Sequence, residues 1–331
     1  MGWIEDWRQR RKQNAEIRAK ERRIASALEQ SIDQVVRHFD PVVHAVSGVR
    51  KQLREPVRKA SDHVGAVVDA IGGPIDLTPD HWPKDPTLRA MFVDAQSIRC
   101  ILRQTADIKS LFKAEPTDRL IALLTATRKE KTVFTAAMEG GIVKRDVAQT
   151  SVEFIDHRVV APALSEAETR HDLKGQALAI IARRALEEVT TLKSWKSELT
   201  EQSNALSAQL QVFRKPAVGL DSFSADPAES PSRESEARQL LRDIDDKLKE
   251  LSQTLSTPED YLRHLIRYLN HPETAITAER LTLRLNWMGV KLRTDSPEAE
   301  APITLTEMDF KSRGKRVAVL VTLFRKDILV D

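Results

Sequence analysis

Apolar residues recur three and four positions apart along most of the chain, which is the spacing of amphipathic helices. The first such stripe begins at Ile17, ends at Phe39 and is followed by Asp40-Pro41. Asp followed by Pro is a helix-start signal, because Asp caps a helix and Pro is favoured at its first position. We therefore predict a basic, amphipathic N-terminal helix over 1–39 and a new helix that begins at Asp40.

The next part of the chain, 40–162, is predicted to be a helical body. Asp85-Pro86 repeats the start signal, and a long apolar face from there to Leu111 predicts one long helix. The apolar residues from Leu120 to Met138 predict a second helix that packs against the first and ends at Gly140-Gly141. The stretch 142–162 has a mixed pattern, which we also interpret as helix.

Two further apolar stripes predict an antiparallel coiled-coil hairpin over 163–256. The first helix begins at Ser165 and Glu168, which have the spacing of a capping box. The second carries apolar residues in strict alternation of three and four, as in a coiled-coil seam, at Leu241, Ile244, Leu248, Leu251 and Leu255. The segment 216–233 between them is rich in Ala, Ser, Asp and Pro, so we predict a flexible linker there.

The apolar period changes from that of a helix to two after position 270, which is typical of β-strands. A short helix from Pro258 precedes three alternating runs, at 283–290 with a bulge at Gly289, at 303–305 and at 317–323. The segment 257–331 is therefore predicted to be a short helix plus a small three-stranded antiparallel sheet. The fold class that follows is mostly α, of the α+β type.

The last of these strands is apolar on both faces. Its even positions include Leu320 and Phe324, which are too apolar to stay in water as a broad patch. The N-terminal helical body, a second copy of the chain or another protein could cover them. We expect a dimer or partner contact through Leu320 and Phe324.

Composition limits the functions that the chain can have. The net charge is +3 from 52 basic and 49 acidic side chains, so no global field attracts nucleic acid or anionic lipid. Cys100 is the only cysteine, which fits a reducing compartment, and its apolar surroundings predict that it is buried. The N-terminus does not read as a secretory signal, and no apolar run approaches the roughly 20 residues of a membrane span. We expect a cytoplasmic location.

Candidate catalytic and metal-binding residues are few. Glu168 and His171 would share a helical face, with Glu153 and His157 upstream, but a di-metal site needs a second Glu-x-x-His and two more glutamates. We therefore interpret Glu168 as a helix cap. The sequence has no Walker motif, dinucleotide motif or Gly-x-Ser-x-Gly, so we expect no cofactor and no enzymatic activity, although a site assembled from distant residues leaves no local motif.

Two basic clusters could contact a partner. Trp3, Ile4 and Trp7 share a helical face, and the basic run that follows includes Arg8, Arg10 and Arg11. Such a segment suits a groove on another protein or an anionic membrane, unless it folds back onto the body. The second cluster is interpreted as charge that guards the apolar strand against edge pairing, and comprises Lys311, Arg313, Lys315 and Arg316.

These observations favour a non-enzymatic intracellular scaffold or adaptor that acts through helical and coiled-coil surfaces. Its partner would be another protein or a second copy of the chain, and no small-molecule substrate is implied. The alternative is a peripheral membrane or nucleic-acid-binding protein that uses the basic N-terminal helix.

Overall fold

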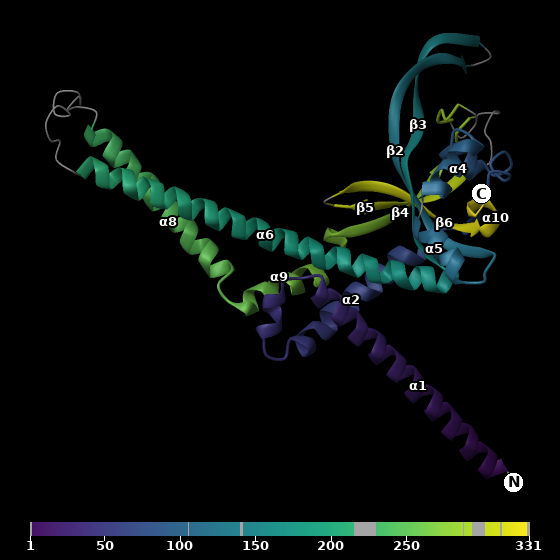
Figure 1. Cartoon of the computed structure of the whole chain (residues 1–331), viewed down its shortest axis with the longest axis horizontal. Coiled ribbons are helices and arrows are strands. Elements are labelled where there is room, and N and C mark those ends of the chain that lie inside the picture. Colours follow the sequence, from purple (N-terminus) through teal and green to yellow (C-terminus); the bar gives the residue numbers. More distant parts are fainter. Residues whose placement is uncertain are drawn as a thin grey trace. The chain divides into compact units, whose positions relative to one another are not determined.

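A computed structural model describes residues 2–104, 106–139, 142–214, 230–286, 288–292, 302–311 and 313–329 of the chain (Figure 1). The side chains of 2–17, 106, 135–139, 142–146, 212–214 and 230–233 lie outside this description. The chain forms two compact units, and the fold is of the α+β class. Unit 1 comprises Met1–Val57 with Ala182–Asn270, and unit 2 comprises Arg58–Ile181 with His271–Asp331. Within the described residues, no helix is apolar over a length that would cross a membrane.

Unit 1 is helical. It contains α1 (Gly2–Arg37), the 3-10 helix η1 (Pro41–Ala45), the first part of α2 (Val49–Asp69), the later part of α6 (Glu166–Arg214), α8 (Ser230–Thr254) and α9 (Pro258–Asn270). Asp40 caps η1, because its carboxylate accepts a hydrogen bond from the Val42 amide at 3.0 Å. The start signal at Asp40 is therefore confirmed, but it opens a single short 3-10 helix. The longer helix α2 begins only at Val49 and continues through Pro56.

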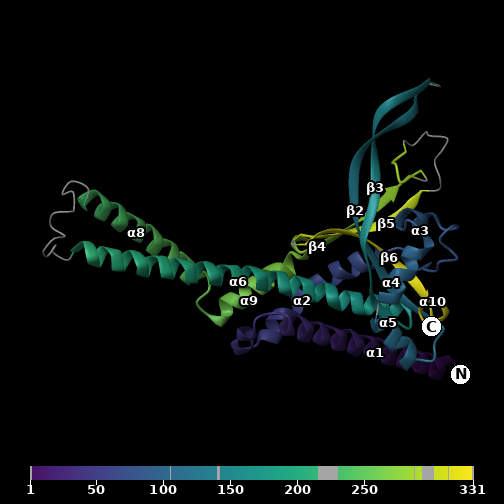
Figure 2. The same cartoon turned by 45° about the horizontal axis from the view of Figure 1, so that its top comes forward.

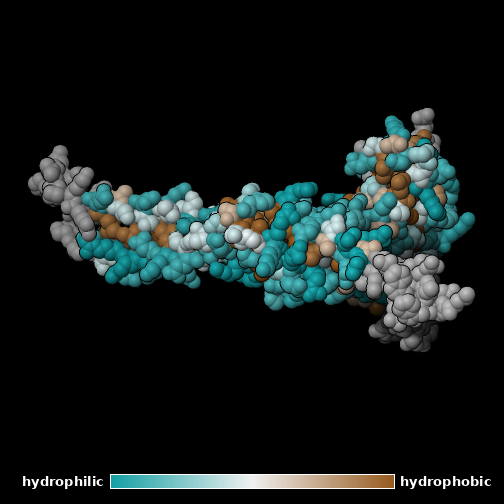
Figure 3. Space-filling view, turned by 90° about the horizontal axis from the view of Figure 1, so that it is seen from below, coloured by the Kyte–Doolittle hydropathy of each residue, from teal (hydrophilic) through white to brown (hydrophobic). Residues whose placement is uncertain are grey.

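Helices α6 and α8 of unit 1 lie side by side and antiparallel (Figure 1). Leu199 of α6 and Ile244 and Leu251 of α8 form a small buried cluster, flanked by the partly buried Leu192, Leu206 and Leu248. Figure 3 shows apolar surface along the paired helices. We call the paired stretches of α6 and α8 the arm. The predicted linker lies outside the described residues up to position 229, and 230–233 belong to α8.

Unit 2 contains a six-stranded sheet. Its strands are β1 (Ile75–Asp76), β2 (Arg119–Glu139), β3 (Ile142–Ala163), β4 (Ile276–Leu283), β5 (Ile303–Phe310) and β6 (Gly314–Phe324). The order is β3-β2-β6-β5-β4 with antiparallel pairing, and β1 pairs with β6 in parallel. The second and third predicted strands are confirmed as β5 and β6. The first was predicted at 283–290, but β4 ends at Leu283, and the prediction of a separate three-stranded sheet was wrong.

The helix predicted from Leu120 to Met138 and the helix predicted over 142–162 are in fact two long paired strands, β2 and β3. The residues of β2 that are fully buried alternate, at Leu120, Ala122, Leu124 and Ala126, which is the period of a strand. Leu123 is also buried between them, and this extra apolar residue gave the run a helical appearance. The strands pair from Ile121 with Ala163 to Glu139 with Ile142, so only positions 140 and 141, outside the described residues, connect them. A Gly-Gly pair between two such runs is a hairpin signal.

The helix predicted over 86–111 is three short helices: α3 (Pro86–Met91), α4 (Ala95–Gln104) and α5 (Ala106–Ala114). Asp85 caps α3 with hydrogen bonds from Thr87 and Leu88, so the start signal is confirmed. The extended backbone of Phe92 then ends the helix. Cys100 lies in α4 and is exposed, so the prediction that it is buried was wrong. Unit 2 is completed by the 3-10 helix η2 (Pro272–Thr274) and by α10 (Arg325–Ile328).

Strand β6 occupies the centre of the sheet, between β2 and β5, and it is buried on both faces. Leu320 is fully buried, and its amide donates to the carbonyl of Gly72 at 2.8 Å. The backbones approach so closely here that a side chain at Gly73 would clash with Leu320. The chain itself therefore covers Leu320, which corrects the expectation of a partner contact through this residue. Phe324, at the end of β6, is partly exposed, and its partner role stays a prediction.

The sheet curls, and residues that follow β4 reach its opposite edge (Figure 2). The Val152 amide of β3 donates to Gly289, and the Lys291 amide donates to Thr150, each at 2.8 Å. Strand β4 ends at Leu283, and Gly289 lies in a tight turn with a positive φ of 74°. The bulge predicted at Gly289 is thus a turn that joins the last strand of the sheet to the first.

Candidate functional sites

A cleft of about 650 Å³ lies beside the curled sheet of unit 2. Its floor is formed by buried apolar side chains from α3, β3, β5 and the turn after β4, which are Met91, Phe92, Val152, Phe154, Leu285 and Ile303. Its rim carries Trp82, Val93, Val133 and Met288 together with the polar residues Arg89, Lys131, Ser151, Glu153 and Asn286. This size and this mixture of an apolar floor with a few polar groups are typical of ligand-binding sites.

Hydrogen bonds to the backbone position the floor of the cleft. The Nε2 atom of His157, on β3, lies 2.8 Å from the carbonyl oxygen of Met91, and the imidazole stacks on Phe92 with 4.5 Å between ring centroids. The indole Nε1 of Trp82 donates to the Phe92 carbonyl at 3.0 Å. Burial lowers the pKa of His157, because a charged imidazolium would lose its hydration there. A neutral imidazole therefore holds the end of α3 against the sheet.

The turn after β4 forms a second wall of the cleft. The Asn286 carboxamide oxygen accepts hydrogen bonds from the amides of Met288 at 3.0 Å and Val290 at 2.9 Å. Gly289 then passes so close to β3 that an added Cβ would lie 2.9 Å from the Val152 carbonyl oxygen. The conformation that glycine permits is required here, both for the positive φ and for the close approach. The turn holds the Met288 side chain at the rim, where it is 51% exposed.

An ion pair lies at the rim on the β2–β3 side. The Lys131 ammonium contacts the Glu153 carboxylate at 2.8 Å, and this hydrogen bond holds the pKa of Glu153 below its usual range. Both side chains are at least half exposed, so the pair contributes little to stability. Arg89 of α3 also lines the cleft, which gives the lining two cationic residues and one anionic residue.

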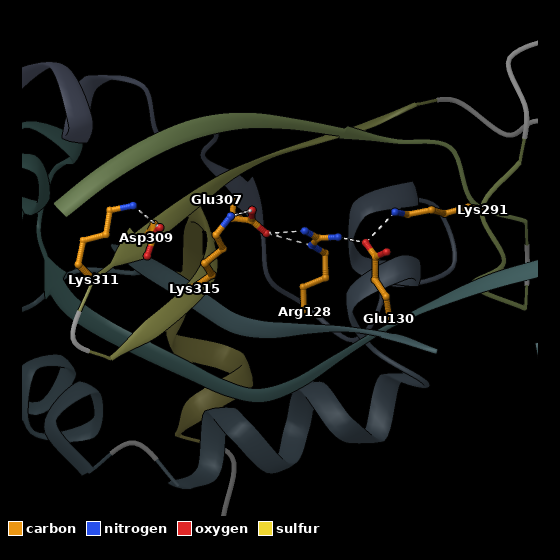
Figure 4. A network of polar contacts seen from close by, with 7 residues as sticks. All are labelled: Arg128, Glu130, Lys291, Glu307, Asp309, Lys311 and Lys315. Atoms are coloured by element: carbon orange, nitrogen blue, oxygen red, sulfur yellow. Dashed lines mark hydrogen bonds and ion pairs between the residues drawn. The ribbon is translucent and has the colours of Figure 1, made fainter. Parts of the chain in front are cut away.

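A ladder of alternating charges lies on the sheet near the turn after β4 (Figure 4). Lys291 contacts Glu130 at 2.6 Å, Glu130 contacts Arg128, and Arg128 donates to Glu307 from Nε at 3.0 Å and from Nη2 at 2.8 Å. Lys315 is 3.4 Å from the same Glu307, whose side chain is only 10% exposed. Desolvation, and then the nearby Arg128, lower the pKa of Lys291. The ladder joins β2 to β5, to β6 and to the turn after β4, and these ion pairs stabilise the curled form of the sheet.

The arm of unit 1 carries a groove of about 380 Å³. Its apolar lining comes from α6, α8 and the start of α9, and comprises Leu192, Leu251, Leu255 and Tyr261. Lys193 closes one end, since its ammonium contacts Asp40 at 2.7 Å and lies 4.7 Å from the centroid of the Tyr261 ring. The hydrogen bond to Asp40 raises the pKa of Lys193. Lys196, Ser197, Thr200 and Glu201 form the outer wall.

A second polar cluster of unit 1 joins α6 to α9. Glu188 pairs with Arg267, and His264 lies near the same carboxylate, with 3.7 Å between its Nδ1 and Oε1. Nδ1 of His264 is buried, and it is one of the few buried side-chain atoms in the described part of the chain that make no hydrogen bond. Burial lowers the pKa of His264, although Glu188 opposes this shift.

The structure disperses the residues that the sequence singled out. Trp3, Ile4, Trp7, Arg8, Arg10 and Arg11 belong to α1, but their side chains lie outside the described part of the chain. Ser165 caps α6 through the Glu168 amide at 3.3 Å, as predicted. Lys311 and Lys315 pair with Asp309 and Glu307, and Arg316 pairs with Asp156.

The structure also shows what sequence reasoning missed. Glu153 and His157 were considered only as metal ligands. Glu153 lines the cleft, and His157 contacts Met91 and Phe92 of its floor. No group of three or more His, Cys, Asp or Glu side chains in the described ranges is placed to hold a metal ion. The cleft itself was missed because Met91, Phe154, Leu285 and Ile303 were assigned to unrelated elements. The one available signal was the Gly-Gly pair between two β-branched runs, which would have revealed the β2–β3 hairpin.

Comparison of the chain with known protein families, with curated proteins and with solved structures finds no match.

Proposed function

We propose that the protein is a non-enzymatic cytoplasmic scaffold or adaptor that binds a helix of a partner protein in the groove of the arm. The observation that carries this proposal is the apolar surface that the arm leaves uncovered. The seam between the two helices buries the small cluster of Leu199, Ile244 and Leu251. The partly exposed Leu192 lines an open groove at the side of that seam together with Leu255, which is 9% exposed.

A third helix is the partner element that fits this groove best. Helical partners dock by placing apolar residues at one face into a groove between two helices. The regular spacing of Leu192, Leu199 and Leu206 by seven residues supports a coiled-coil geometry for the arm, in which an added helix would extend the same packing. The sequence-based expectation of coiled-coil surfaces belongs to this proposal.

The charges of the groove indicate which helix would bind. Lys193 is neutralised by Asp40, whereas Lys196 makes no ion pair within the described residues. A partner helix with an acidic residue beside its apolar stripe would pair with Lys196. The lone cysteine of the chain is compatible with a reducing compartment, which supports the proposed cytoplasmic location.

Two threonines of α6 provide a matched test. Thr200 lines the groove, and Thr191 lies nine positions earlier, which is about two and a half helical turns and thus the opposite side of the helix. Both are exposed, and each hydroxyl donates to the carbonyl four residues before it, at 2.8 Å from Thr200 and 2.9 Å from Thr191. An arginine at either position therefore costs the same local contact.

The experiment compares Thr200→Arg with Thr191→Arg in the tagged full-length chain, purified under native conditions from the cells that make it. We expect one protein to co-purify in stoichiometric amount with wild type and with Thr191→Arg, and to be lost with Thr200→Arg. A second copy of the chain as the lost component would make the protein a homo-oligomer. Equal recovery with both variants would contradict the proposal.

A further inference from the structure

The cleft of unit 2 exposes apolar side chains that the packing of the sheet does not require. Val93 at its rim is 89% exposed and Met288 is 51% exposed, although both adjoin a floor of nearly fully buried residues. Large apolar residues exposed around a concave surface indicate a binding site more often than those that are scattered singly. Met288 and Met91 also give the lining flexible side chains that adapt to ligands of varied shape.

We propose that this cleft binds an amphiphilic carboxylate, with its hydrocarbon chain on the apolar floor and its acidic head at the rim beside Lys131. The volume of about 650 Å³ lies within the usual range of small-molecule sites. Phe92, Phe154 and Ile303 contribute apolar side chains to the floor on which the hydrocarbon chain would lie.

Charge selects an acid over a neutral or cationic amphiphile. The lining carries Arg89 and Lys131 against the single carboxylate of Glu153. Lys131 forms an exposed ion pair with Glu153, and such a weak pair is readily exchanged for one with a ligand carboxylate. An ammonium head would instead meet a lining with one more cationic than anionic side chain, which opposes its binding.

The cleft is also organised before any ligand enters. His157 and Trp82 fix the backbone of Met91 and Phe92, and Asn286 fixes the turn that carries Met288. A site whose walls are already held loses little conformational entropy on binding. This inference is independent of the groove in unit 1, because the two sites share no residue.

The test is a fluorescence titration of the intact protein with cis-parinarate, a fluorescent long-chain carboxylate, followed by displacement with palmitate. We expect saturable binding at one site and displacement by palmitate. Methyl palmitate and hexadecylamine should displace the probe at least about fivefold less well, since they lack the acidic head.

Variants locate the site. Met288→Glu should weaken parinarate binding about tenfold or more, because it places a carboxylate at the apolar rim. Leu240→Glu, which changes a residue of the arm that is 50% exposed, is its matched control and should have no effect. Lys131→Gln should weaken binding by up to about fivefold, whereas Lys129→Gln, on the same strand but outside the cleft, should not.

Several results of these titrations would contradict the proposal. Absence of saturable binding would overturn the proposal, and so would binding that Met288→Glu leaves unchanged while its circular dichroism and melting temperature match wild type. Equal displacement by palmitate and its methyl ester would overturn the assignment of an acidic head. If Met288→Glu and Leu240→Glu weakened parinarate binding equally, the binding would be non-specific adsorption. This result would also overturn the proposal.

Discussion

The sheet of unit 2 and the arm of unit 1 bury apolar residues in opposite ways. Val317, Val319 and Val321 of β6 are at most 3% exposed, and the residues between them are also buried. The arm buries one narrow seam and leaves Trp195 and Leu240 about half exposed. Two-sided burial makes β6 the structural centre of its unit, whereas the arm retains apolar surface that can bind a partner.

The largest difference in stability should appear when a lysine is placed in the sheet of unit 2 and, separately, in the arm of unit 1. Leu320→Lys puts an ammonium at a fully buried position, so we expect an insoluble or unfolded product. Leu240→Lys changes a half-exposed leucine of α8 and should alter the free energy of unfolding by less than about 0.5 kcal/mol. Chemical denaturation of both variants measures the contrast. A soluble, stable Leu320→Lys protein would mean that β6 is not central.

A substitution in the charge ladder of unit 2 should cause the next largest loss in the free energy of unfolding. Arg128→Met leaves the Glu307 carboxylate, with its side chain 10% exposed, to Lys315 alone. We expect a loss of about 2 kcal/mol in the free energy of unfolding, because a largely buried charge loses its nearest partner. The double variant Arg128→Met with Glu307→Leu should recover part of that loss. An additive double variant would show that the two side chains do not interact.

The Ser165 cap of α6 should contribute less to the free energy of unfolding than the charge ladder does. Ser165→Ala removes the hydroxyl that accepts from the Glu168 amide, and a lost cap costs about 1 kcal/mol. Thermal melting of Ser165→Ala beside Ser165→Asp, which restores a capping acceptor, measures the effect. Equal melting temperatures for Ser165→Ala and Ser165→Asp would contradict the stabilising role of the Ser165 cap.

The smallest effect should appear in the dependence of stability on pH. Burial lowers the pKa of both His157 in unit 2 and His264 in unit 1. The unfolded chain then takes up a proton near the usual histidine pKa of about 6.5 while the folded chain does not, so stability falls as pH decreases below that value. His157→Gln should flatten this decline between about pH 7 and 5, as should His264→Gln. Melting curves across that range check both variants, and an unchanged slope would contradict the burial of the imidazole.

Local signals predicted several helix starts and the last two C-terminal strands, β5 and β6, well. Asp40, Asp85 and Ser165 cap elements where the sequence placed them, because a cap depends on neighbouring residues only. The alternation at Val317, Val319 and Val321 likewise identified β6. The partner role given to Leu320 failed because the segment that covers it, at Gly72 and Gly73, is remote in the sequence.

The cleft could not be predicted, for a related reason. Its lining joins α3, the three strands β2, β3 and β5, and a turn, from positions 82 to 303, and only tertiary pairing brings them together. The β2–β3 hairpin was misread because Leu123, buried beside Leu124, broke the alternation that marks a strand with one buried face. A strand buried on both faces has no such alternation, so periodicity alone does not distinguish it from a buried helix.

Site-specific photo-crosslinking shows whether a partner protein occupies the groove of the arm. A benzophenone amino acid at Thr200 faces the groove, whereas one at Thr191 faces away from it. If a partner helix binds in the groove, crosslinking in living cells gives a single discrete adduct from position 200 and none from position 191. The adduct from position 200 should be lost when Lys196→Glu reverses the charge beside it. Equal labelling from both positions, or an adduct that Lys196→Glu leaves unchanged, would contradict the claim.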